Sequence, residues 1–181
     1  RYQANPNYKI GIQCGLAGID NWLGGFEPGT YTLIMARPSV GKTALAINMA
    51  DNMAEEGLIN FYSLEMGEKA LARRILAKKS NINLTNIRLG KVSELECGVL
   101  TEKMNDILES GLRMFDPPHY KIIENLVSHA ENAHIQEPLS AIFIDHIHKM
   151  RANKKTGNRE AEIAYISDSL ASLAKNLYVP V

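Results

Sequence analysis

The sequence predicts an α/β fold with a mostly parallel sheet flanked by helices. Short apolar runs typical of buried strands alternate with longer stretches of helical periodicity, which is the pattern of a doubly wound sheet. The composition is that of an ordinary globular domain, with 45% hydrophobic and 22% charged residues. With 181 residues the chain is long enough for one domain with a substantial core.

The first residues predict a connection rather than a folded element. Residues 1–14 begin without Met and include the polar turn-forming run Asn-Pro-Asn, so we interpret them as the remnant of an interdomain linker in a fragment of a longer protein. The folded domain is expected over residues 15–181. Its first part, residues 15–29, contains five glycines and is expected to turn repeatedly around a few apolar anchors.

The first half of the domain predicts two strands, each followed by a helix. The apolar run 31–36 predicts a buried strand, and apolar spacing over 43–54 predicts the helix after it. Residues 59–64 predict the next strand, after a helix stop at a glycine. Helical periodicity resumes over residues 68–79.

The second half predicts three more helices around one apolar strand. Helices are expected near 93–110 and 119–134, and the fully apolar run 141–144 predicts a strand. A polar loop follows, and residues 159–176 carry apolar side chains at helical spacing. From residue 178 the sequence predicts the start of another strand, so the sheet is expected to be truncated at the C-terminal end.

A phosphate-binding loop is predicted between the first strand and its helix. The run Ala36-Arg-Pro-Ser-Val-Gly-Lys-Thr matches the pattern of a glycine, four residues and then Gly-Lys-Thr, except that alanine replaces the first glycine. A strand before the loop and a helix after it are the context that phosphate binding requires. The expected nucleotide-binding residues are Ala36, Arg37, Pro38, Ser39, Val40, Gly41, Lys42, Thr43 and Ala44.

Three residues of this loop have distinct expected roles. Gly41 allows the backbone to turn close to the phosphates, where a Cβ would intrude. Lys42 reaches the β- and γ-phosphates as a compact charge and contributes to catalysis, and the Thr43 hydroxyl is a magnesium ligand. The pattern therefore predicts binding of a Mg²⁺–nucleoside triphosphate.

Two carboxylates are expected near this loop, because both follow predicted parallel strands. Asp145 ends the run 141–144 and is our candidate second magnesium ligand, although an aspartate after an apolar run is common. Glu65 ends the run 59–64 and is our candidate general base. A carboxylate at a helix N-terminus is also favoured by the helix dipole, so on spacing alone both interpretations of Glu65 stay open.

Several motifs together resemble replicative hexameric DNA helicases of the DnaB type. The phosphate-binding loop with the following Ala-Leu-Ala-Ile-Asn-Met-Ala resembles the first motif of that family. Ser63-Leu-Glu-Met is similar to its second motif, and the run from Asn158 through residues 179–181 resembles the stretch after its metal-binding aspartate. The resemblance covers nearly the whole chain, least clearly over 85–135.

This resemblance implies a function and a set of partners. It implies a RecA-like ATPase core in which Glu65 is the catalytic base, with ATP and Mg²⁺ bound between subunits of a ring, a hexamer in the complete protein. It further implies coupling of ATP hydrolysis to translocation on single-stranded DNA and to duplex unwinding, with primase and a helicase loader as partners. The family's sensor glutamine, DNA-contacting loops and arginine finger would follow residue 181.

One departure from the family pattern follows Asp145. The family continues with Tyr-Leu-Gln-Leu-Met, whereas this chain has His-Ile-His-Lys-Met, so His148 stands at the glutamine position. His146 and His148 could form a metal pair, but two residues apart at a strand end they are expected to point to opposite faces.

The charge and the cysteine content indicate which partners and which cellular location to expect. The net charge is zero, so a strongly basic surface is absent. The basic run between 149 and 159 fits either a DNA channel or a solvated loop, and the basic positions between 69 and 79 fit a solvated or subunit-facing helix side better than a DNA contact. Two distant cysteines, no apolar run long enough for a membrane span and no signal peptide favour a cytoplasmic protein.

Two other functions compete with the helicase interpretation. A RecA-like ATPase of the recombination or clock type would share the phosphate-binding loop and the glycine-rich segment before it. A nucleotide-binding interaction module without turnover would share the loop but not the catalytic role of Glu65. Unwinding activity and the effect of Glu65→Gln on hydrolysis separate these possibilities.

Overall fold

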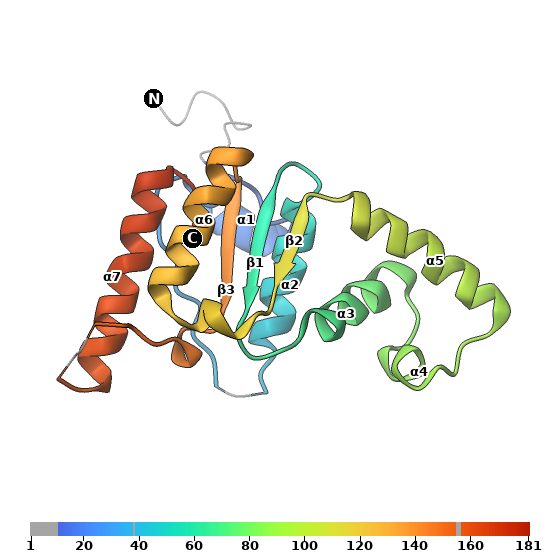
Figure 1. The fold of residues 1–181 in the computed structure, drawn as a ribbon. Helices are drawn as coiled ribbons and strands as arrows, with labels where there is room; N and C mark the ends of the chain where they lie inside the picture. Colours follow the sequence, from blue (N-terminus) through green and yellow to red (C-terminus); the bar gives the residue numbers. More distant parts are fainter. Residues whose placement is uncertain (1–10, 38, 155–156) are drawn as a thin grey trace, which may run out of the picture.

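Three parallel strands form the sheet, in the order β2-β1-β3 (Figure 1). They are β1 (Ile59–Ser63), β2 (Leu112–Phe115) and β3 (Ala141–Asp145). The computed structural model describes residues 11–37, 39–154 and 157–181. The parallel sheet confirms the predicted fold class, and β1, all five residues of which are buried, lies in its centre.

Helices cover both faces of the sheet because side chains alternate along each strand. One face packs against α2 (Lys42–Met53), α3 (Glu68–Ser80) and α5 (Glu94–Glu109), in a core that includes Ile59 and Phe61 of β1. The other face packs against α6 (Ile123–Gln136) and α7 (Arg159–Leu177). In Figure 1, α6 and α7 lie on one side of the sheet, and α3 to α5 extend from the opposite edge.

The predicted helices form with their ends shifted by a few residues. Helix α5 begins at a capping box, in which the Ser93 hydroxyl accepts from the Glu96 amide and the Glu96 carboxylate accepts from the Ser93 amide. Asn158 caps α7 in a similar way, through the amide of Ala161. The 3-10 turn Pro118–Lys121 delays the start of α6 relative to the expected 119.

Three short elements were not predicted. Helix α1 (Ala17–Leu23) forms within the glycine-rich segment, α4 (Leu84–Leu89) follows α3, and β2 pairs beside β1. None of these has the length or the apolar periodicity that a sequence pattern needs. The strand β2 contains an exposed Arg113 and forms because its backbone pairs with β1.

The prediction of a buried strand over residues 31–36 is wrong. The segment forms no assigned strand, and Leu33 and Met35 are 50% and 82% exposed. Among the described residues, the segment pairs with Val181 through one backbone bond, from the Thr32 amide to the Val181 carbonyl, and the Val181 amide donates to the preceding Thr30. An apolar run becomes a buried strand only when neighbouring strands complete its hydrogen bonds, and here the pairing ends at Thr32.

The described residues that precede α1 pack onto the domain. Ile12 forms an antiparallel bridge with Phe26, and Cys14 is fully buried in the core. The Asp20 carboxylate accepts a hydrogen bond from the Cys14 amide at 2.8 Å. Residues 1–10, which make up most of the predicted linker 1–14, lie outside the described residues.

Candidate functional site

The site lies at the carboxyl edge of the sheet. In the parallel register of β1 and β3, Ser63 pairs with Asp145, and the Leu64 amide donates to the Asp145 carbonyl at 2.7 Å. Both strands therefore end side by side, which places Glu65 and Asp145 at the same edge. The N-terminus of α2 meets this edge from one face of the sheet (Figure 1).

The loop before α2 has the backbone of an anion-binding turn. Gly41 has φ 109° and Ser39 has φ 66°, both in the left-handed region. A Cβ at Gly41 would meet no described atom within 4 Å, so its conformation, rather than contact with the protein, requires glycine there. No side chain caps the helix, and its first turn contains no acidic residue. Pro38 lies outside the described residues.

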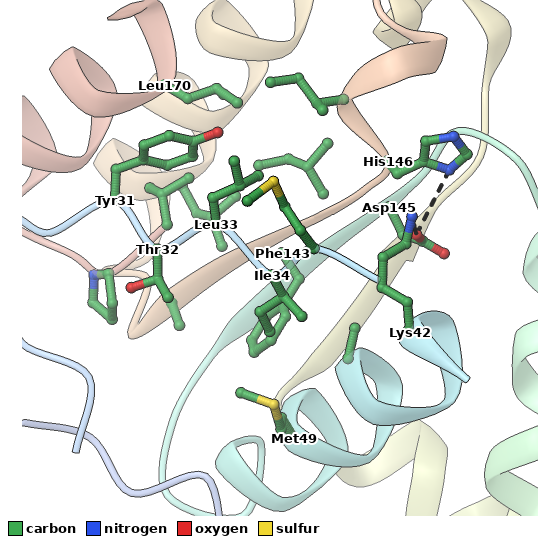
Figure 2. Close-up of a pocket in the computed structure, with 18 of the residues that line it drawn as sticks. Tyr31, Thr32, Leu33, Ile34, Lys42, Met49, Phe143, Asp145, His146 and Leu170 are labelled. Atoms are coloured by element: carbon green, nitrogen blue, oxygen red, sulfur yellow. Dashed lines mark ion pairs between the residues drawn. The ribbon is translucent and has the colours of Figure 1, made fainter. Parts of the chain in front are cut away.

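Lys42, Thr43 and Asp145 converge at the start of α2. The Thr43 hydroxyl donates to Oδ2 of Asp145 at 2.6 Å, and Nζ of Lys42 lies 3.8 Å from Oδ1. Asp145 is 2% exposed, so its charge depends on these two partners. Figure 2 shows the Lys42 side chain extending from α2 toward Asp145, beside the ring of His146.

Glu65 faces His146 across the same edge. Oε2 of Glu65 lies 3.0 Å from Nδ1 of His146, whose second acidic neighbour, Oδ1 of Asp145, is 3.8 Å away. The Glu65 side chain is 50% exposed, whereas that of His146 is 18% exposed. The pKa of His146 is lowered below its ordinary value, mainly by burial and to a smaller extent by the Lys42 ammonium. The carboxylates of Glu65 and Asp145 act in the opposite direction.

The loop fits phosphates, and the adjacent oxygens fit magnesium. Gly41 leaves open space at an uncapped helix N-terminus, where amide groups and the Lys42 ammonium favour an anion. Thr43 and Asp145 present hard oxygen ligands side by side, and magnesium commonly takes one or two protein ligands together with phosphates and water. Among the described residues, no group of three or more His, Cys, Asp or Glu side chains could hold a metal by itself.

The remaining loop residues flank this cradle. Ala36, Arg37, Ser39 and Val40 are exposed around the left-handed turn, and Ala44 is half-buried in the first turn of α2. Arg37 accepts a backbone hydrogen bond from Val40 at 3.4 Å.

The two histidines after β3 do not point to opposite faces as predicted. The expectation itself is wrong, because residues two apart in a strand lie on the same face. In the structure the strand ends at Asp145, and residues Ile147–Lys149 form a 3-10 turn. The rings of His146 and His148 lie 6.1 Å apart between centroids, in an edge-on arrangement. The sequence pattern did not indicate that His146 contacts Glu65, because that contact joins two strand ends 81 positions apart.

Much of the basic run after β3 is occupied within the protein. Arg159 pairs with Glu162 and donates to the carbonyls of Met150 and His148, while the Lys154 ammonium lies 5.2 Å from the ring centre of Tyr165. The Arg151 side chain donates to the Met150 carbonyl. These contacts favour a surface loop over a DNA channel for the described residues of the run. Lys155 lies outside the described residues.

An apolar cavity of about 460 Å³ adjoins the site. It lies between residues 31–36 and β3, with Lys42, Asp145 and His146 at one end and Val181 among its other lining residues (Figure 2). Side chains of α2 and α7, among them Met49 and Leu170, also line it.

Comparison with known proteins identifies similar chains. The family model of the DnaB-like helicase C terminal domain matches residues 11–181. The replicative DNA helicase DnaB of Treponema pallidum is 36% identical over 183 residues, which include all of this chain and 41% of that protein. The chain therefore spans about two fifths of this relative's length. In the described residues no helix has both the length and the apolar character of a membrane span.

Two solved structures share the fold closely. One is a solved ATPase domain that superposes with a TM-score of 0.89 at 27% identity, covering 99% of this chain and 65% of that one. A DnaB-like replicative helicase, studied with its primase interactions, gives the same TM-score and identity, covering 99% of this chain and 45% of that one.

Proposed function

Because this chain belongs to the family of DnaB-like helicase C-terminal domains, we propose that it is the ATP-hydrolysing motor of a replicative DNA helicase. The observation that carries the proposal is the convergence of Lys42, Thr43, Asp145 and Glu65 at one edge of the sheet. The family match over residues 11–181 favours this function over a RecA-like ATPase of the recombination or clock type.

Phosphate binding is assigned to the loop and the first turn of α2. The amides of residues 39–43 and the Lys42 ammonium would hold the β- and γ-phosphates of ATP. Thr43 and Asp145 would hold the magnesium ion, which neutralises charge on the phosphate oxygens when it is bound. The buried position of Asp145 supports this role, because its carboxylate faces the Thr43 hydroxyl rather than solvent.

Glu65 is assigned as the general base. Its carboxylate is half-exposed beside the site, so it can accept a proton from a water molecule that attacks the γ-phosphorus. Removal of that proton generates the oxygen nucleophile, the bond between the γ-phosphorus and the β,γ-bridging oxygen breaks, and ADP is the leaving group at the loop.

The proposal includes partners of the whole protein. We infer assembly into a ring, with a hexamer as the expected form, and translocation on single-stranded DNA in the cytoplasm. One solved relative was studied with primase, which supports primase as a partner of the complete protein, and a helicase loader completes the expected set. The ATPase domain at 15–181 and a preceding linker belong to the same proposal, although Ile12 and Cys14 of the predicted linker 1–14 pack onto the domain.

Mg²⁺-dependent ATP hydrolysis measured over a range of protein concentrations, with and without single-stranded DNA, tests this function. The test uses this chain and the complete protein in parallel. We expect turnover by the complete protein to rise with concentration and with DNA, and to disappear in Lys42→Ala. Glu65→Gln should lower turnover to a small residual rate while ATP still binds. Hydrolysis by Glu65→Gln at a rate near wild type would contradict the assignment of the base, and ATP binding without any turnover by the complete protein would instead identify a nucleotide-binding module.

A further inference from the structure

His146 occupies the gap between the two carboxylates of the site. Its Nδ1 atom is buried and has no aligned hydrogen-bond partner among the described residues. The nearest acceptor is Oε2 of Glu65 at 3.0 Å. This distance is within the range of a hydrogen bond, but the N–H of His146 does not point at the oxygen.

We infer that His146 is a positioning residue that holds the carboxylate of Glu65 in place for hydrolysis. This inference rests on the proposed function, in which Glu65 is the base. Glu65 lies on the short connection between β1 and α3, and the described contacts of its carboxylate involve no other charged group. A long, half-exposed side chain needs such a partner, because rotamer freedom would otherwise reduce the time that it spends in a reactive position.

The geometry favours Glu65 rather than Asp145 as the group that His146 orients. Asp145 already accepts from Thr43 at 2.6 Å, and its Oδ1 atom lies 3.8 Å from Nδ1 of His146, which exceeds a hydrogen bond. A neutral imidazole that carries its proton on Nδ1 would donate to Glu65. The opposite tautomer would place a nitrogen lone pair against the carboxylate.

The kinetic test compares His146→Leu with His146→Asn in the complete protein on single-stranded DNA. Leucine removes the donor, whereas the asparagine amide can place one near the position of Nδ1. We expect His146→Leu to lower kcat by about tenfold with little change in KM for ATP, and His146→Asn to restore most of the loss. His119→Leu, which removes an exposed histidine outside the site, is the matched control and should stay near wild type.

The double variant with Glu65→Gln tests whether the two residues act together. If His146 acts through Glu65, adding His146→Leu to Glu65→Gln should lower the residual rate no further. An independent further loss, a change in KM alone, or no rescue by a correctly folded His146→Asn would each overturn the inference.

A spectroscopic measurement on the 181-residue chain decides the contact without turnover. The ring ¹⁵N resonances of His146, identified by their loss in His146→Asn, should indicate a proton on Nδ1 and should shift in Glu65→Ala. A proton on Nε2 together with no response to Glu65→Ala would overturn this inference alone. Absence of ATP hydrolysis by the wild-type complete protein would instead overturn the proposed function.

Discussion

Asp145 keeps its carboxylate in a position that is 2% exposed, and one short hydrogen bond from Thr43 supports it there. An ionised group in such a position is costly unless it has partners, and here the Lys42 ammonium at 3.8 Å is the second. The same three side chains are those assigned to phosphate and magnesium binding. Stability and the proposed chemistry therefore depend on the same atoms.

The variant Thr43→Val tests this shared dependence at the residue level. Valine keeps the shape of threonine but removes the hydroxyl, which leaves a buried carboxylate oxygen without its donor. We expect the free energy of unfolding, measured with urea, to fall by about 1–3 kcal/mol. ATP hydrolysis should be lost as well. Thr43→Ser keeps the hydroxyl and should retain both, so equal stability of all three proteins would contradict this account.

His129 predicts a pH dependence of stability that is separate from the site. The Tyr62 hydroxyl and Nδ1 of His129 lie 2.7 Å apart, and Asn60 donates to the same hydroxyl at 3.4 Å. With Asn60 as donor, Tyr62 donates onward to a neutral His129, within a cluster of aromatic rings that includes Phe115 and Tyr120. Burial, and then the nearby His119, lower the pKa of His129.

The sign of this dependence follows from the lowered pKa. The unfolded chain takes up a proton near the ordinary pKa of 6.5, whereas folded His129 resists protonation. The contribution of neutral His129 to the free energy of unfolding is therefore fully present above that pH, and it decreases as the pH falls toward the folded pKa. We expect urea unfolding to show this loss in the wild type and a smaller loss in His129→Gln. An identical pH slope in both proteins would contradict the role of His129.

At the scale of elements, an ion-pair cluster joins α2 to α3. Asp51 of α2 is buried, and its two oxygens lie 2.9 and 3.1 Å from the ammonium groups of Lys78 and Lys79. Both lysines belong to the basic set that the sequence placed on a solvated or subunit-facing helix side. In the structure both lysines instead form ion pairs with a buried carboxylate, which holds α3 against α2.

Replacing one lysine should therefore lower the free energy of unfolding much less than replacing both. Either Lys78→Met or Lys79→Met leaves Asp51 one partner, whereas the double variant leaves a buried charge without a partner. We expect about 3 kcal/mol of destabilisation for the double variant and less than half of that for each single one. Chemical denaturation of the four proteins measures this, and additive losses would show that the two lysines do not share Asp51.

For the whole molecule, the most distinctive feature is the apolar cavity between residues 31–36 and β3. The chain approaches it at Pro180, whose carbonyl accepts from the Ile142 amide, and at Val181, which bonds to Thr30 and Thr32 on the other side. Residues 180–181 thus already bridge the two walls at one end of the cavity. Beyond them the walls stay apart, and apolar side chains line the space.

This cavity should bind an apolar fluorescent dye in the native chain. Its volume of about 460 Å³ and its apolar lining are those of small-molecule pockets. Ile34→Trp would place a larger side chain in the space and should reduce dye fluorescence, whereas Ile135→Trp, at a position 79% exposed, should not. Dye fluorescence unaffected by Ile34→Trp would place the dye elsewhere.

The sequence by itself determined the parallel α/β class and the five long helices, and it indicated the loop before α2 for which phosphate binding is proposed. These follow from local causes, namely apolar periodicity, caps and glycine conformations, which a sequence pattern contains. It also indicated Glu65 and Asp145 as candidates, because both follow apolar runs that become neighbouring parallel strands.

Only the tertiary structure decided which neighbours these residues have. The short β2 exists through its pairing with β1, and the apolar run 31–36 stays outside the sheet because its backbone pairing ends at Thr32. The contact of His146 with Glu65 and the ion pairs of Asp51 join residues far apart in the chain. Such contacts depend on strand register and helix packing, which arise from the burial of whole faces and leave no local pattern in the sequence.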